Sequence, residues 1–412
     1  MDELDLRAEA QLDPAIDPRA APVRLHSPPE VVFLTGATGF LGSFLLHELL
    51  ERTSAVVHCL VRARDAEHGV GRIVESLTGR GLWDERYRAR LAGVPGDLAL
   101  PSLGMSARAL DQIAEEADLI YHAGALVNFM YGYAYLRPAN VEGTVEVLRL
   151  AVTRRVKAMH HVSTWGVLRG APAAGRAPVR EDEDIDQFRS HRQGYAQTKW
   201  VAEKLVRLAA ARGLPACVLR PAYISGHSVT GVASIADARL RMLQTCLRLG
   251  LAPLSESPYD MAPADIVARN MISILLGPEA LGRTFHIYNP HTITWTELIR
   301  WASGRGYDVR LIPFDDWERV VKNPEADHPT DGHGGKERRL RTLTPPIRGF
   351  LGLRGTSLWL REQPLRLDCR NALSTLGESG DYPAIDDALL EVYFGHLVRI
   401  GFLEPPDGLA AR

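Results

Sequence analysis

The chain has 412 residues, 46% of them hydrophobic, so it is long enough for two or three lobes and apolar enough to fill a core. Glycine (36 residues) and proline (26 residues) lie near their average usage, which excludes collagen-like and mostly disordered chains. The 48 basic and 50 acidic residues give a formal charge of −2, and without a basic excess nucleic-acid binding is not expected.

Cysteine usage and hydropathy indicate the class of protein. The four cysteines are scattered without the spacing of a metal site or a disulfide framework, so we expect no metal and a reducing cytoplasm. The first residues are acidic where a signal peptide would be basic. No stretch approaches the roughly 20 apolar residues that cross a bilayer, so a soluble protein without membrane association is expected.

The first 225 residues predict a leader followed by an α/β domain. Residues 1–29 carry five prolines among charges and alanines, which predicts an extended leader or linker. From Val31 onward, β-rich runs alternate with helical patterns, which indicates βαβ units and a Rossmann-type, doubly wound parallel sheet over 30–225. The clearest strands are expected at 31–34, 55–61, 119–122, 159–163 and 216–220.

The rest of the chain has a different pattern. Helices are expected at 236–250, 263–276 and 296–304, and a strand at 284–288 is expected to return to the sheet. Residues 226–412 are therefore predicted to be mainly a smaller, mostly helical lobe that binds substrate. The acidic run at 180–186 is expected to be a solvated loop.

A glycine-rich turn follows the first strand. Gly36 permits a tight turn, Gly39 lets backbone N–H groups approach a pyrophosphate, and Gly42 lets the helix pack close to the strand. Three glycines at GxxGxxG spacing are weak evidence alone, but the strand before them and the amphipathic helix after them predict a dinucleotide site. The predicted contacts are Thr35, Gly36, Thr38, Gly39, Phe40, Leu41 and Gly42.

The end of the second strand favours one nicotinamide cofactor. Arg62 stands about where an acidic residue would bind the ribose 2′-OH of NAD. A guanidinium there pairs with a 2′-phosphate instead, so NADPH is predicted. Arg72 is a second candidate for that phosphate, with an exposed helix arginine as the alternative. Asp97 and Leu98, after the third strand, are expected to cover the adenine.

Tyr195 and Lys199 stand at i and i+4 on a predicted helix, so they share one face. The lysine is expected to lower the pKa of the phenol and make it a proton donor or oxyanion partner. Thr164, at the end of the strand 159–163, would complete an oxyanion site, and it is preferred over Ser163 because strand alternation turns that residue to the other face. His161 and its neighbour are more simply buried histidines than catalytic ones.

Three blocks of sequence make the chain resemble a known family. They are 121–128 (YHAGALVN), 136–144 (LRPANVEGT) and 194–203 (GYAQTKWVAE). With the glycine turn and Thr164, they resemble the extended short-chain dehydrogenase/reductases. Within that superfamily, the chain is similar to the thioester reductase domains that terminate nonribosomal peptide and polyketide assembly lines and carboxylic acid reductases.

This resemblance implies a reductive release. A carrier protein would present an acyl or peptidyl thioester on its phosphopantetheine arm, and NADPH would reduce it to an aldehyde and, with a second hydride, to a primary alcohol. Tyr195 and Thr164 would hold the oxyanion, while Tyr195 and Lys199 would also contact the cofactor. Further implied cofactor contacts are Ala123, Gly124, Ala125, Asn128, Pro221 and Ile224, and the residues that would edge the substrate channel are Ser228, Thr230 and Gly231.

The resemblance leaves the partner and the molecular context open. The sequence carries no recognisable adenylation or carrier domain, so either an excised terminal domain or a free-standing reductase is expected, monomeric or within a larger synthetase. A basic group would dock an acidic carrier, or would simply be a solvated loop. Its members are Lys336, Arg338, Arg339 and Arg341.

Three rival functions share the fold. A fatty acyl-CoA reductase would use the same catalytic residues with another thioester. A nucleotide-sugar epimerase or dehydratase would typically need an acid where Arg62 stands. A non-catalytic NADPH-binding scaffold would need the glycine turn but not Thr164, Tyr195 and Lys199.

Overall fold

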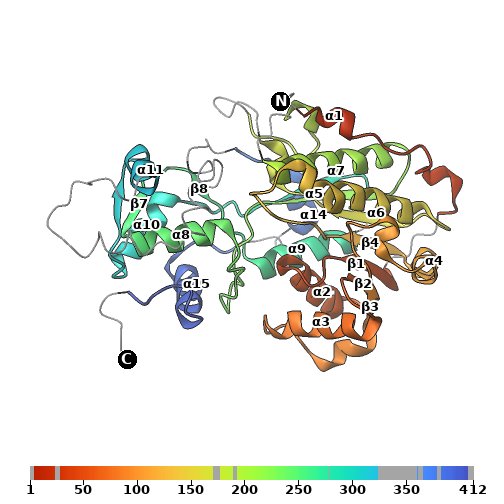
Figure 1. Ribbon diagram of the computed structural model, residues 1–412, viewed down its shortest axis with the longest axis horizontal. Helices are drawn as coiled ribbons and strands as arrows, with labels where there is room; N and C mark the ends of the chain where they lie inside the picture. Colours follow the sequence, from red (N-terminus) through yellow and green to blue (C-terminus); the bar gives the residue numbers. More distant parts are fainter. Residues whose placement is uncertain are drawn as a thin grey trace. The chain divides into compact units, whose positions relative to one another are not determined.

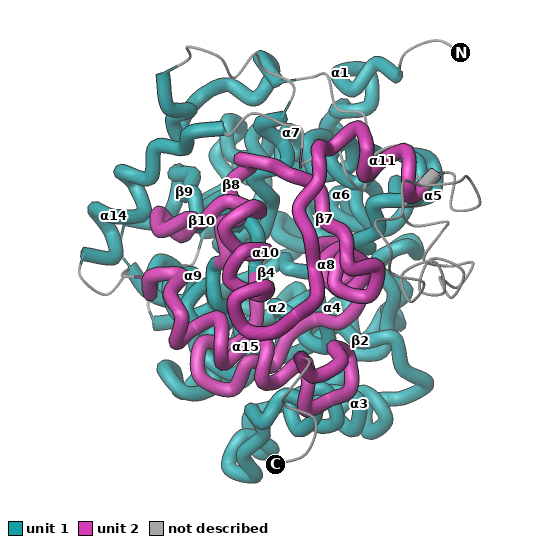
Figure 2. The backbone as a smooth tube through the Cα atoms, turned by 90° about the vertical axis from the view of Figure 1, so that its left-hand side faces the viewer, with its two compact units in different colours: residues 1–224, 262–288, 365–381 teal, residues 225–261, 289–364, 382–412 magenta. Residues whose placement is uncertain are grey.

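The computed structural model describes residues 4–23, 28–169, 177–188, 193–277, 279–322, 360, 365–377 and 382–406. The chain divides into two compact units, coloured separately in Figure 2. Unit 1 comprises Met1–Ile224, Ala262–Tyr288 and Leu365–Asp381. Unit 2 comprises Ser225–Met261, Asn289–Pro364 and Tyr382–Arg412.

Unit 1 is built on a seven-stranded sheet in the order β3-β2-β1-β4-β5-β6-β9. Every neighbouring pair is parallel, as the alternation of strands and helices predicted. The carboxyl ends of the strands therefore share one edge, where α/β proteins bind ligands. The strands are β1 (Val31–Thr35), β2 (Val56–Val61), β3 (Leu91–Pro95), β4 (Leu119–His122), β5 (Ala158–Val162), β6 (Ala216–Pro221) and β9 (Thr284–Ile287).

Helices cover both faces of this sheet (Figure 1). One layer contains α2 (Phe40–Arg52), α3 (Ala66–Thr78) and α9 (Ala264–Leu276), with α2 packed against each of the other two. The other contains α5 (Tyr133–Arg137), α6 (Gly143–Val152) and α7 (Gly194–Ala211), with α4 (Ala107–Glu116) packed on α6. A π-helical turn, η4 (Pro138–Glu142), joins α5 to α6. The predicted Rossmann-type α/β fold is confirmed.

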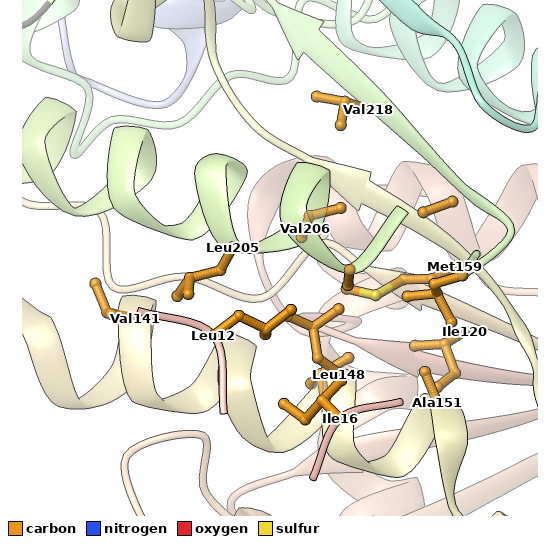
Figure 3. Close-up of a cluster of buried hydrophobic side chains, with 14 of the residues drawn as sticks. Leu12, Ile16, Ile120, Val141, Leu148, Ala151, Met159, Leu205, Val206 and Val218 are labelled. Atoms are coloured by element: carbon orange, nitrogen blue, oxygen red, sulfur yellow. The ribbon is translucent and has the colours of Figure 1, made fainter. Parts of the chain in front are cut away.

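The leader is not an extended linker, which corrects the prediction for its described residues. The short helix α1 (Leu6–Glu9) is followed by chain that buries Leu12 and Ile16 against α6 and α7 (Figure 3). Arg212 donates hydrogen bonds to the carbonyl oxygens of Leu12, Asp13 and Ile16. The prolines predicted a linker, but the apolar residues Leu12 and Ile16 between them pack into the hydrophobic core.

Unit 2 combines helices with two small sheets. The helices among its described residues are α8 (Ala238–Leu249), α10 (Trp295–Gly304), α11 (Phe314–Lys322) and α15 (Asp387–Arg399). β7 (Leu251–Pro253) pairs with β11 (Arg310–Ile312), and β8 (Pro258–Tyr259) pairs with β10 (Ile293–Thr294). Gly250 ends α8 in the left-handed conformation, with φ of +69°.

The division of the chain differs from the expected boundary at 226. Besides β9, α9 and the segment that carries α14 (Arg370–Leu376) belong to unit 1. The buried carboxylate of Glu181 explains this last return, since it accepts hydrogen bonds from the backbone nitrogens of Asn371, Ala372 and His286. Glu181 is only 3% exposed, so the run 180–186 is not simply solvated. The basic group at 336–341 lies outside the described residues.

None of the described helices combines the length and the apolar character needed to span a membrane.

Candidate active site

The turn between β1 and α2 has no room for side chains on its inner surface. Gly36 has a φ of +84°, and a Cβ there would lie 2.7 Å from the Gly124 nitrogen. A Cβ on Gly42 would lie 1.9 Å from the Gly36 carbonyl oxygen, so α2 begins in contact with the turn. Gly39 is the N-cap residue of α2, and no described side chain caps this helix end. The helix terminus can therefore bind an anion, and the glycine-lined cradle fits a dinucleotide pyrophosphate.

Thr38, Phe40 and Leu41 complete this turn. Ser76 on α3 donates a 3.2 Å hydrogen bond to the Thr38 carbonyl oxygen, and the Phe40 ring meets Phe44 edge-on with centroids 5.3 Å apart. Leu41 is half-buried. These contacts link the turn to α2 and α3.

A directed chain of hydrogen bonds fixes the sheet edge beside the turn. The Gly124 nitrogen donates to Thr35 Oγ1 at 2.9 Å, and Thr35 Oγ1 lies 2.8 Å from His122 Nδ1. The Thr144 hydroxyl donates to the Asn140 carbonyl oxygen, so Thr144 Oγ1 accepts from His122 Nε2 at 3.1 Å. His122 is therefore protonated on Nε2, and Thr35 donates to Nδ1. Burial is the main cause that lowers the pKa of His122 to about 3, which keeps the ring neutral.

Two arginines lie together at the end of β2. Arg62 follows the strand directly and is exposed, and Arg72 on α3 donates from Nη1 to the Arg62 carbonyl oxygen. The structure thus brings the Arg72 guanidinium to the backbone of Arg62, at the end of the strand where the sequence predicts a 2′-phosphate site.

The loops after β3 and β4 converge on the glycine turn. A Cβ on Gly124 would lie 2.6 Å from Leu98 Cδ1, so these residues are in contact, and half-buried Ala123 and Ala125 flank Gly124. The carboxylate of Asp97 accepts a 2.9 Å hydrogen bond from the Ala99 nitrogen and so stabilises the turn of the loop in which it lies. Asn128 also serves its loop, and its Oδ1 accepts from the nitrogens of Met130 and Tyr131.

Thr164, Tyr195 and Lys199 come from β5 and α7. Thr164 follows β5 and its Oγ1 accepts from the Gly166 nitrogen at 3.2 Å. Tyr195 lies half-buried in the first turn of α7, and Lys199 lies one turn further. Lys199 Nζ donates a 2.7 Å hydrogen bond to the Val162 carbonyl oxygen, which ties α7 to the carboxyl end of β5.

Burial governs the protonation of both α7 residues. It raises the pKa of Tyr195 to about 12, whereas the sequence predicted that Lys199 would lower it. Desolvation of the phenol is the cause of this rise. Burial also lowers the pKa of Lys199 to about 8, against the attraction of Glu203. At neutral pH the phenol therefore keeps its proton and the lysine is charged.

Ser163 belongs to a buried ion pair. Its hydroxyl donates a 2.6 Å hydrogen bond to Glu203 Oε2, and Arg220 Nη2 donates to Glu203 Oε1 at 2.5 Å. Both charged side chains are fully buried. Desolvation opposes the charge of Glu203, but attraction to Arg220 and Arg207, together with the hydrogen bonds from Arg220 and Ser163, lowers its pKa to about 2.

Comparison with known proteins decides the family. Residues 34–271 match the NAD-binding family model described as "Male sterility protein". The crystal structure of the terminal R domain from the myxalamid PKS-NRPS biosynthetic pathway is 38% identical, covers 98% of this chain and 99% of its own, and superposes with a TM-score of 0.87. The chain belongs to the reductase (R) domain family.

Two curated proteins contain a region similar to this reductase domain. A subunit of linear gramicidin synthase from Brevibacillus parabrevis is 37% identical over 81% of the chain, and the large subunit of L-2-aminoadipate reductase from Penicillium chrysogenum is 33% identical over 97%. The chain spans only 6% and 29% of their lengths. It is a nicotinamide-dependent reductase by family.

Two buried polar residues without a predicted role, Asn140 and Glu203, stabilise the surroundings of the site. Asn140 exchanges hydrogen bonds with both backbone groups of Leu126, and its Nδ2 donates to Thr198 Oγ1, so it fastens the loop after β4 to α7. Glu203 stands four residues beyond Lys199, as Lys199 does beyond Tyr195. This spacing places Glu203 on the same face of the helix, and it was the sequence feature that could have indicated a role for it. Nothing in the sequence paired Glu203 with Arg220.

The remaining predicted residues follow β6. Pro221 is its last residue, and Ile224 forms a parallel bridge with Ala262 in unit 1.

The residues predicted for the substrate channel lie in unit 2. There Gly231 has a φ of +74°, and a Cβ would lie 2.5 Å from the Val392 carbonyl oxygen, so packing on α15 explains this glycine. The other two, Ser228 and Thr230, precede it in the same loop.

Proposed function

We propose that this reductase domain releases an acyl or peptidyl chain from a carrier protein by reducing its thioester to an aldehyde, with NADPH as the cofactor. The observation that carries the proposal is the hydrogen bond from Lys199 Nζ to the Val162 carbonyl oxygen, because it brings the turn of α7 after Tyr195 to the end of β5, just before Thr164. The glycine cradle lies at the same edge of the sheet. A binding module would need the cradle without this proton-transfer apparatus.

Each catalytic side chain has a defined task. The cofactor, when bound, would supply the hydride that reduces the thioester carbonyl carbon. Tyr195 holds its proton at neutral pH, so it donates a hydrogen bond and then that proton to the carbonyl oxygen as charge develops there. Thr164 donates a second hydrogen bond to the same oxygen. The Lys199 ammonium stabilises the phenolate that Tyr195 becomes.

The first reduction gives a hemithioacetal. Its hydroxyl returns a proton to the Tyr195 phenolate as the C–S bond breaks, and the thiolate takes up a proton and leaves as the thiol. An aldehyde remains, and a second hydride and proton would give the primary alcohol. The same residues serve both reductions, because both place charge on the same oxygen.

The choice of NADPH rests on Arg62 and Arg72. Arg62 is exposed at the end of β2, and Arg72 is hydrogen-bonded to its carbonyl oxygen. Two guanidinium groups at this position favour a 2′-phosphate over a bare ribose. NADH would gain nothing from them.

Membership of this family supports a carrier protein as the partner. The myxalamid R domain is a terminal domain of a PKS-NRPS pathway. We therefore assign a carrier-bound thioester, rather than a free CoA ester, as the substrate of this domain. A cytoplasmic location fits the free thiols of Cys59, Cys217 and Cys246.

One assay separates this function from its rivals. The same acyl chain is offered on a carrier protein, as a CoA thioester and as a free aldehyde, while NADPH oxidation is followed and the products are identified by mass. Carrier-dependent oxidation to an aldehyde or alcohol supports the proposal. Equal or faster oxidation with the CoA thioester would identify an acyl-CoA reductase instead.

A further inference from the structure

An uncharged, largely exposed segment follows β4. The ten residues 126–135 include no charged side chain, and six apolar side chains among them are exposed. Exposure reaches 62% for Tyr135, 58% for Val127 and 54% for Met130. Single exposed apolar residues are ordinary, but a contiguous group marks a site that binds a ligand or partner. We name this group the apolar strip; its members are Leu126, Val127, Phe129, Met130, Tyr131 and Tyr135.

The backbone of the apolar strip is fixed against α7. Asn140 binds both the nitrogen and the carbonyl oxygen of Leu126, at 2.7 and 3.1 Å. A Cβ on Gly194, the first residue of α7, would lie 2.5 Å from the carbonyl oxygen of Tyr131. These contacts hold the strip in one position, so its exposed side chains form a preorganised surface.

One member of the apolar strip contacts Tyr195. The ring of Phe129 meets the ring of Tyr195 edge-on, with centroids 5.5 Å apart and an interplanar angle of 79°. Tyr131 and Tyr135 continue the aromatic surface, with centroids 4.2 Å apart. Tyr135 lies on α5, which packs against α7 (Figure 1). A chain attached to a carbonyl carbon beside Tyr195 would therefore meet this surface.

Four backbone groups of the apolar strip are bound by two asparagine side chains. Leu126 is bonded by Asn140 through both backbone groups, and the nitrogens of Met130 and Tyr131 donate to Asn128 Oδ1. The exposed side chains of the strip offer mainly carbon, apart from the tyrosine hydroxyls. A phosphopantetheine arm needs partners for its amides and phosphate, and an acidic carrier surface needs cations. An uncharged hydrocarbon or aromatic chain needs neither.

We propose that the apolar strip binds the acyl portion of the substrate and gives the enzyme a preference for long, uncharged, apolar chains. This inference rests on the proposed thioester reduction, whose substrate class it makes specific. Each methylene that the strip fully covers tightens binding by up to about fourfold.

The first test measures binding without reduction. S-ethyl and S-decyl thioethers of N-acetylcysteamine, which contain no reducible carbonyl, are titrated calorimetrically into the NADPH-bound chain. The decyl probe should bind the wild type at least tenfold more tightly than the double variant Met130→Ser, Tyr135→Ser. Equal dissociation constants would overturn the proposal. Leu373→Ser, at a 58% exposed side chain on α14, is the matched control and should bind the decyl probe like the wild type.

The second test uses thioesters. The ratio of kcat/KM for decanoyl to acetyl N-acetylcysteamine thioester should fall at least tenfold in the double variant and stay unchanged in Leu373→Ser. If neither thioester is reduced while decyl-selective binding persists, the proposed function fails and the apolar strip stands as a binding site. If the double variant loses affinity for a carrier protein that bears no acyl chain, the strip binds protein and the proposal is wrong.

Discussion

Ser163 Oγ donates a 2.6 Å hydrogen bond to Glu203 Oε2, and this bond distinguishes two adjacent hydroxyls at the end of β5. The Ser163 proton is committed to a buried carboxylate, whereas among the described residues the Thr164 hydroxyl accepts from the Gly166 nitrogen and donates to none, which leaves its proton for a ligand. The proposed mechanism therefore uses Thr164. Strand alternation, which turns neighbouring side chains to opposite faces, gives the same preference.

Glu203→Gln should destabilise the protein by about 3–5 kcal/mol, because it leaves Arg220 buried without its counter-charge. Urea unfolding followed by circular dichroism would measure the loss. The exposed Glu67→Gln is the control and should change stability by no more than about 0.5 kcal/mol. The pKa of Glu203 is lowered from 4.5 to about 2, so its contribution is present above pH 4.5 and disappears as the pH falls toward 2. A Gln variant as stable as the wild type at pH 7 would contradict the role of this pair.

Gly36→Ala should abolish cofactor binding, since its Cβ would lie 2.7 Å from the Gly124 nitrogen at a φ of +84°. Gly71→Ala is the matched control, because a Cβ there meets no atom of the described chain within 4 Å inside helix α3. That control should bind NADPH normally and gain about 0.5–1 kcal/mol in stability. Titration calorimetry and thermal unfolding distinguish the two variants. Normal NADPH affinity in Gly36→Ala would remove the turn from the cofactor site.

Arg62→Ala should raise the Kd of NADPH at least tenfold and leave that of NADH nearly unchanged. The reason is the loss of a charged hydrogen bond to the 2′-phosphate, which NADH lacks. Arg64→Ala tests the specificity of the effect, because Arg64 is exposed nearby and pairs with Asp65. If Arg62→Ala raised the Kd of NADPH and of NADH equally, Arg62 would not be the residue that binds the 2′-phosphate.

The pH dependence of kcat/KM should report Lys199. Burial lowers the pKa of this lysine to about 8, so the charged form that supports Tyr195 predominates below pH 8 and is lost above it. Activity should therefore fall about tenfold per pH unit above pH 8, while thermal unfolding shows that the protein stays folded. A constant kcat/KM from pH 7 to 9.5 would show that the lysine charge is not required.

The sheet and the glycine turn could be predicted from the sequence. The alternation of strands and helices and the spacing of Gly36 and Gly42 are local features that can be seen within short stretches of the chain. Contacts between segments that lie far apart in the sequence could not be predicted. Glu181 looked like one of several solvated acids, and only the fold brings it to the backbone of Asn371. The pKa of Tyr195 was predicted in the wrong direction, because a helical spacing gives the distance to Lys199 but not the desolvation of the phenol.

The central claim is that hydride reaches the thioester carbonyl carbon under control of Tyr195, and isotope transfer tests it most directly. A carrier-bound acyl thioester is reduced with NADPH that carries deuterium at the transferred position of C4, and the product is analysed by mass spectrometry. We predict one deuterium on the aldehyde carbon. Tyr195→Phe should bind NADPH normally and transfer the label at least about 100-fold more slowly. Release of a free acid without deuterium, or undiminished transfer by Tyr195→Phe, would contradict the account.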